Sequence, residues 1–236
     1  MLYMPPASEN ARTNRPEFFF VGTHPAIDFA NTLVPPPGPG IEFLRAWPDV
    51  IDWLAQMKLS KDSRLDLPET RRSEALKTVV ELRQAWRDVL ASLIAGGKVS
   101  DDFLMRLNGL LAMDSFHETL HRVGKKRFQL VHSTTQLHGH KLALAILARQ
   151  IALFLAEANL NYLRRCANTS SCVLYFYDTT KNHRRQWCSV AMCGNRHKVA
   201  EFRRRQREVR EAASPAGGQT PVATSATIRV DRFQIA

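Results

Sequence analysis

The sequence lacks most features expected of a secreted, membrane-embedded or catalytic protein. Residues 1–15 contain no apolar run, so we expect no secretory signal and thiols that stay reduced in a cytosol. The most apolar window, residues 142–160, is interrupted by Arg149, Gln150 and Glu157, which a lipid-exposed helix tolerates poorly. We find no phosphate-binding glycine loop, nucleophile elbow or open metal-ligand pair. The sequence therefore favours a cytoplasmic protein that is neither an enzyme nor a membrane protein.

Acidic residues are scarce relative to basic ones. The 236 residues include 22 Asp and Glu against 33 Lys and Arg, which gives a formal net charge of +11. Residues 178–211 alone hold ten basic and four acidic side chains, and so carry +6 of that charge. A chain with this net charge is expected to bind an anionic partner, and nucleic acid is a more common partner of basic proteins than a membrane surface.

Cysteine is absent from most of the chain, and all four cysteines fall within one short stretch. They are Cys166, Cys172, Cys188 and Cys193. In a reduced compartment, four clustered thiolates are typical of a closed, structural Zn²⁺ site rather than of a catalytic one. The five residues within the first pair exceed the usual spacing of two to four. Unrelated buried cysteines, a thiol switch and an iron–sulfur cluster remain alternatives, and His183 or His197 could replace a cysteine as ligand.

The residues around these cysteines predict a small zinc module. Residues 173–178 have strand composition, residues 184–187 could form a return strand, and residues 198–211 have helix composition. A β-hairpin followed by a helix is the order of a treble-clef-like module. Zinc would contribute on the order of 10 kcal/mol of folding free energy to a unit this small.

Arginine dominates the predicted C-terminal helix, and its guanidinium group suits contact with phosphate or guanine. Arg196, Arg203, Arg207 and Arg210 fall on one stripe, next to an apolar stripe of Val199, Phe202 and Val209. A solvated helix with local Arg–Glu pairs is the alternative. The candidate nucleic-acid-binding residues are Arg184, Arg185, Arg196, Lys198, Arg203, Arg204, Arg207 and Arg210.

The rest of the chain predicts a mostly helical α+β domain. Apolar spacing indicates helices at residues 24–33, 47–57, 68–94, 101–111 and 141–165. Strand patterns occur at residues 18–21 and 127–132, the second paired in a hairpin after Gly124. We therefore divide the chain into a flexible arm (1–16), an α+β domain (17–163), a zinc module (164–212) and a flexible tail (213–236).

Several of these strings resemble a known family. Cys166, Cys172, Tyr175–Asp178, Arg184–Ser189 and the Cys193-Gly194-Asn195-Arg196 string resemble the CGNR zinc-finger family, with Thr179 where the family often has Ser. Members commonly carry an N-terminal domain called ABATE, of stress-induced bacterial transcription regulators. Ile27–Thr32 resembles its Leu-Asp-Phe-x-Asn-Thr signature. The resemblance spans most of residues 18–211 and implies that the four cysteines bind zinc and that the module binds DNA.

The leading hypothesis is thus a zinc-dependent DNA-binding transcription regulator. An RNA-binding or ribosome-associated zinc protein is the alternative, because Tyr175, Phe176 and Tyr177 could stack on unpaired bases. A zinc-thiolate redox sensor or protein-interaction module is a third reading. Asp28 and Asn31 are candidates for holding a small-molecule effector, although short polar side chains more often cap helices or satisfy loop backbone groups. The sequence leaves a homodimer open.

Overall fold

The computed structural model describes residues 17–36, 40–113, 116–125, 127–134 and 136–213. The predicted arm (1–16) and all but the first residue of the predicted tail (213–236) lie outside this range. Of the described residues, those up to Asn195 form one compact unit, and those from Arg196 onward belong to a second.

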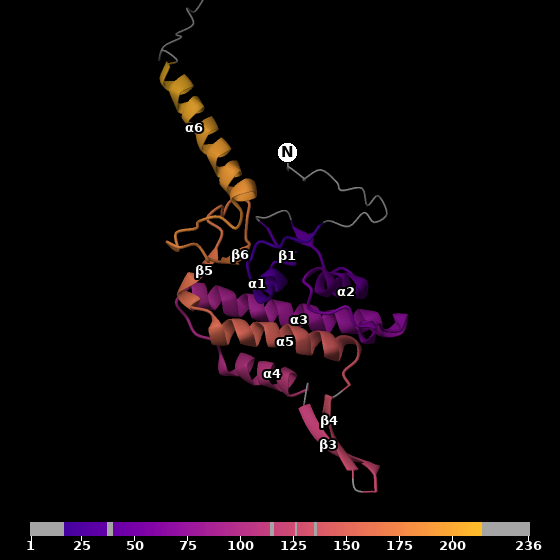
Figure 1. Cartoon of the computed structure of the whole chain (residues 1–236). Coiled ribbons are helices and arrows are strands. Elements are labelled where there is room, and N and C mark those ends of the chain that lie inside the picture. The colour runs from indigo at the N-terminus through magenta and orange to yellow at the C-terminus, as the bar shows by residue number, and fades with distance from the viewer. Residues whose placement is uncertain (1–16, 37–39, 114–115, 126, 135, 214–236) are drawn as a thin grey trace, which may run out of the picture. The chain divides into compact units, whose positions relative to one another are not determined.

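Helices account for most of the described chain, as the sequence predicts (Figure 1). The α-helices are α1 (Pro25–Ala30), α2 (Trp47–Gln56), α3 (Glu69–Ile94), α4 (Asp101–Ala112), α5 (Gly139–Glu157) and α6 (Asn195–Ala213). Two 3₁₀ turns, η1 (Ser63–Leu65) and η2 (Leu160–Tyr162), and one π-helical turn, η3 (Val190–Gly194), complete them.

The strands form three separate two-stranded antiparallel sheets. They pair β1 (Leu33–Val34) with β2 (Ile41–Glu42), β3 (Phe116–Gly124) with β4 (Arg127–Thr134), and β5 (Leu163–Arg165) with β6 (Tyr175–Tyr177). The α+β class predicted from the sequence is therefore confirmed, with short sheets attached to a helical core.

The core lies between α3 and α5, which pack side by side, with α4 against α5 and α1 against both (Figure 1). Trp86 of α3 is fully buried, and its ring stacks on Phe103 of α4 and meets Phe154 of α5 edge-on. Its indole nitrogen donates to the carbonyl of Ala26 in α1, so burying the ring leaves no donor unpaired. One tryptophan thereby ties four helices together.

Helix α5 is long and apolar enough to cross a membrane, judged by length and composition alone. One of its faces is buried against α3 and α4, where Ala148 and Ile151 have no exposed surface. The predicted helix continued to residue 165, but α5 ends at Glu157. The chain then turns through η2 into β5, whose three residues pair with β6. The helix ends where Ala158 adopts an extended backbone conformation, with φ −82° and ψ 140°.

Two predicted strands do not form. Residues 18–21 are irregular and not fully buried. The backbone hydrogen bond to β6 lies just beyond them, where the carbonyl of Gly22 accepts from the Tyr177 amide. Residues 184–187 are also irregular. The prediction that residues 184–187 form a return strand beside residues 173–178 is therefore wrong. The hairpin of the module is closed instead by β5, which precedes Cys166.

Candidate metal centre and nucleic-acid interface

The four cysteines converge on one buried point. Cys166 follows β5, Cys172 precedes β6, Cys188 lies in the loop after β6, and Cys193 lies in η3. Their four Sγ atoms all lie within 4.8 Å of one another, and the side chains are buried. Two of the separations are 3.7 Å, from Cys172 to Cys188, and 3.5 Å, from Cys188 to Cys193. No disulfide joins these cysteines.

These distances fit a tetrahedral metal site. Four Zn–S bonds of about 2.3 Å place the sulfur atoms about 3.8 Å apart, close to the observed separations and far beyond a disulfide bond. Hydrogen bonds from the neighbouring thiols, Cys172 first, lower the pKa of the Cys166 thiol. The thiolate is the form that binds a metal ion. Within the described chain, His183 and His197 are not part of the cluster.

Two tight backbone turns present the cysteines in pairs. In the first turn, the amides of Ser171 and Cys172 both donate to the carbonyl of Asn168, at 3.2 and 2.8 Å. In the second, the amides of Cys193 and Gly194 both donate to the carbonyl of Ser189. A Cβ at Gly194 would lie 3.2 Å from the Trp187 ring, so this glycine lets the second turn pack against that ring.

Asp178 orders the loop that leads from β6 to Cys188. Its fully buried carboxylate accepts hydrogen bonds from the amide and hydroxyl of Thr180 and from the amide of Arg185, at 2.6 to 3.0 Å. Burial alone would raise the pKa of Asp178, but these hydrogen bonds hold it below its usual value. In the sequence, Asp178 stands out only as the end of a strand pattern and as part of a family string. Its position between a buried aromatic strand and a polar turn was the available signal.

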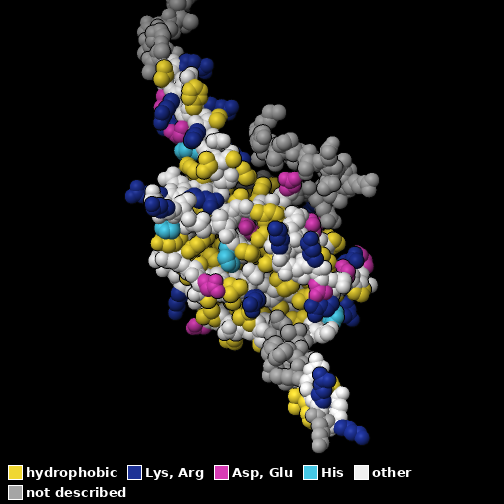
Figure 2. All heavy atoms as spheres, in the orientation of Figure 1, with side chains coloured by type: hydrophobic (Ala, Val, Ile, Leu, Met, Phe, Trp, Pro, Cys, Tyr) yellow, Lys and Arg dark blue, Asp and Glu magenta, His cyan; other side chains and the backbone are white. Residues whose placement is uncertain are grey.

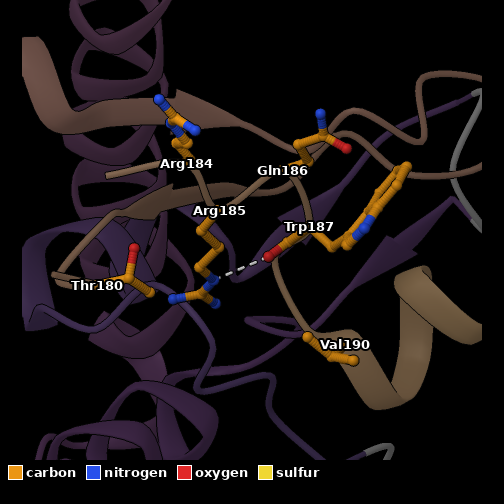
Figure 3. Close-up of a pocket in the computed structure, with 6 residues that line it drawn as sticks. All are labelled: Thr180, Arg184, Arg185, Gln186, Trp187 and Val190. Atoms are coloured by element: carbon orange, nitrogen blue, oxygen red, sulfur yellow. Dashed lines mark hydrogen bonds between the residues drawn. The ribbon is translucent and has the colours of Figure 1, made fainter. Parts of the chain in front are cut away.

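The Arg185 side chain makes its contacts inside the protein. Its guanidinium donates to the carbonyls of Val21, Trp187 and Cys188, and lies 4.5 Å from the centre of the Phe176 ring. Figure 3 shows Arg185 pointing into the loop, whereas Arg184 points away from it. The two border a hollow of about 500 Å³ together with Thr180, Gln186, Trp187 and Val190. Arg184 makes no hydrogen bond or ion pair with the described residues, so of the two it is the one free to meet a ligand.

The effector candidates of the N-terminal region satisfy backbone groups. Asn31 donates to the carbonyl of Tyr175 and accepts from its amide, both at 2.9 Å. Asp28 accepts from the amide of Gly22 at 2.7 Å. Both side chains are buried, with 4% or less of their surface exposed. Burial raises the pKa of Asp28 to about 6. Asn31 thus links the end of α1 to β6, two segments that are far apart in the sequence.

The cysteines share one apolar cluster with the N-terminal region. Val34 and Phe43, from the β1–β2 region, are buried beside the four cysteines, Val173, Leu174 and Phe176. Phe18 and Phe19 pack on the same cluster and contact the Phe43 ring. The metal site is therefore enclosed by two parts of the chain that are far apart in sequence.

The candidate RNA-stacking residues lie inside this structure. Phe176 has no exposed surface, Tyr175 is 6% exposed, and the Tyr177 hydroxyl accepts from the amide of Asn159. The buried rings of Tyr175 and Phe176 are not available to stack on bases, and the half-buried Tyr177 ring packs against Phe154, so the aromatic argument for RNA is weakened.

Helix α6 begins two residues after Cys193 and carries most of the candidate nucleic-acid contacts (Figure 2). Arg203, Arg207 and Arg210 are exposed and form no ion pair with the described residues. Arg204 is paired with both Glu201 and Glu208, at 2.8 and 3.1 Å. Lys198 is exposed, and Arg196 is partly buried. The apolar stripe is exposed in the structure, with Phe202 at 62% and Val209 at 68%.

Comparison with known families matches nearly the whole described chain. The ABATE model, described as "Putative stress-induced transcription regulator", matches residues 23–158 and thus more than half of the chain. The chain belongs to the ABATE family. The CGNR zinc-finger model matches residues 162–206, which include the four cysteines and most of α6. No curated protein matches the chain.

The ABATE segment (residues 23–158) contains both Asp28 and Asn31, and the zinc-finger segment (residues 162–206) contains Tyr175, the partner of Asn31. Neither matched family is described as an enzyme family. Together with the sulfur geometry, the two matches indicate a zinc-binding regulator and confirm the family predicted from the sequence.

Proposed function

We propose that this chain is a cytoplasmic, zinc-dependent DNA-binding transcription regulator in which α6 contacts DNA. The observation that carries the proposal is the direct succession of a closed four-cysteine site and an arginine helix. Gly194 is the last residue of η3, and α6 begins at Asn195. Zn²⁺ held by the four thiolates would fix the turn from which the helix starts. Such a closed shell suits a structural rather than a catalytic ion.

The arrangement of charges on α6 supports contact with a phosphate backbone. At 3.6 residues per turn, Arg203, Arg207 and Arg210 lie on one stripe of the helix. Because these three lack ion-pair partners in the described chain, they can exchange bound counterions for phosphates without first breaking an internal salt bridge. Arg204, held between Glu201 and Glu208, should contribute less.

The salt dependence of binding tests this assignment. We expect Arg203→Ala plus Arg207→Ala to weaken duplex-DNA binding and to flatten the plot of log affinity against log salt by about 2, near 1 per lost phosphate contact. Arg204→Ala is the matched control and should have a smaller effect. An unchanged slope in the double variant would exclude α6 as the contact. Preference for structured RNA over duplex DNA in competition would overturn the DNA assignment.

A further inference from the structure

The β3–β4 hairpin is a two-stranded arm that the proposed function leaves unused. Its strands pair from Phe116↔Thr134 to Gly124↔Arg127, with a bulge at Val123, and they pack chiefly against each other. Every side chain described between residues 120 and 129 is exposed. Two-stranded hairpins are at best marginally stable alone in water, so an arm of this kind needs a partner.

The arm is strongly basic. Residues 119–137 contain no acidic residue and four cations, which are Arg122, Lys125, Lys126 and Arg127. Lys and Arg side chains are visible on the hairpin in Figure 2. Within the described part of the chain, the side chains of Lys125 and Arg127 have no hydrogen bond or ion pair. The local charge is therefore uncompensated.

Apolar side chains lie among these charges. Leu120, Val123 and Phe128 are 66%, 51% and 49% exposed. Arg122 lies 4.7 Å from the centre of the Phe128 ring and donates to the carbonyl of Lys125, which braces the turn. The arm thus offers exposed cations and exposed apolar groups on a ribbon two strands wide.

Duplex DNA fits this combination. The major groove of B-DNA is wide enough for a two-stranded β-ribbon, cations along the ribbon can meet phosphates, and apolar side chains can contact thymine methyl groups or wedge between base steps. The deep, narrow major groove of an RNA duplex admits no such ribbon. We propose that the β3–β4 hairpin is a second DNA-binding element, whose Lys125 and Arg127 contact the phosphate backbone independently of α6.

Charge removal at the hairpin tests this inference without disturbing the core, because the altered side chains are exposed. Lys125→Gln plus Arg127→Gln should lower duplex affinity by about tenfold per lost contact near 0.1 M salt and reduce the salt slope by about 2. The matched control is Arg71→Gln plus Lys77→Gln, which removes two exposed cations from α3 and should leave the slope close to that of the unaltered protein.

The outcomes separate this inference from the assignment of α6. A hairpin variant that binds like the α3 control overturns the inference, and a change in its oligomeric mass without a change in slope would assign the arm to a protein interface instead. If only the Arg203→Ala plus Arg207→Ala variant flattens the slope, the hairpin proposal fails while the α6 assignment stands. If only the hairpin variant flattens the slope, the α6 assignment fails while the hairpin proposal stands.

Discussion

Single polar side chains hold the ABATE and zinc-finger segments together. Asn31 reaches Tyr175, 144 positions away, and satisfies both its amide and its carbonyl. Thr23 donates to the carbonyl of Tyr177, and Arg185 reaches back to Val21. The Asp-x-x-Asn string of the ABATE signature was visible in the sequence, but its partner was not, because a side chain that bonds to backbone leaves no matching residue type to recognise.

Replacing Asn31 should therefore destabilise the whole unit. Asn31→Ala leaves a buried N–H and a buried C=O of Tyr175 without partners, and we expect a loss of about 2–4 kcal/mol in the free energy of unfolding. Urea denaturation of the zinc-loaded protein measures it. Asn161→Ala, at an exposed position of η2, is the control and should cost less than about 0.5 kcal/mol. Equal stability of the two variants would contradict the role of Asn31.

Asp28 makes stability depend on pH. Burial raises its pKa to about 6 from the ordinary 3.8, so the folded protein keeps this proton at pH values where the unfolded chain has lost it. Asp28 therefore lowers the free energy of unfolding as pH rises. This loss is absent below about pH 3.8, grows as pH rises towards 6, and is constant above. Asp28→Asn keeps an oxygen for the Gly22 amide but removes the titration.

We therefore expect the stability advantage of Asp28→Asn over the unaltered protein to grow by about 1 kcal/mol between pH 5 and pH 7.5. Urea titrations of both proteins at each pH measure this difference. Asp66→Asn, at an exposed position, controls for loss of charge without burial. A difference that is constant over this range, or that shrinks with rising pH, would contradict the buried, proton-holding carboxyl.

At the scale of elements, the sequence predicted helices better than strands. The apolar spacing of residues 68–94 predicted α3, which spans Glu69–Ile94, and that of residues 101–111 predicted α4, which Ser100 caps by accepting from the Phe103 amide. These signals are local, because each turn of a helix bonds to the next. The β3–β4 hairpin was also predictable from its turn.

Strand pairing between distant segments was not predictable in the same way. The strand composition of residues 173–178 was correct for β6, but its partner is β5, in a stretch whose apolar residues resembled a continuation of α5. Residues 184–187 are held outside any ladder by Asp178 and by the hydrogen bonds of Arg185. Which of two candidate segments pairs with a strand depends on the tertiary packing around the cysteines.

At the scale of the whole molecule, the four cysteines join the ABATE segment to the helix that follows them. Val34, Phe43 and the cysteines share one apolar cluster, so a metal ion held by the thiolates would also stabilise the packing of the ABATE segment. The clustering of the four cysteines predicted a closed metal site, and the convergence of the sulfur atoms agrees with it. The enclosure of that site by ABATE residues had no local signal in the sequence.

The proposed role of zinc in DNA binding can be measured as the affinity of the chain for duplex DNA before and after zinc removal. The zinc-loaded protein should bind duplex DNA in a salt-dependent manner. Removal of zinc by a chelator should weaken that binding by at least about tenfold, since the turn before α6 and the shared cluster lose their ligated centre. Binding should return when zinc is restored. Unchanged affinity in the zinc-free protein would show that DNA binding does not depend on the four-cysteine site.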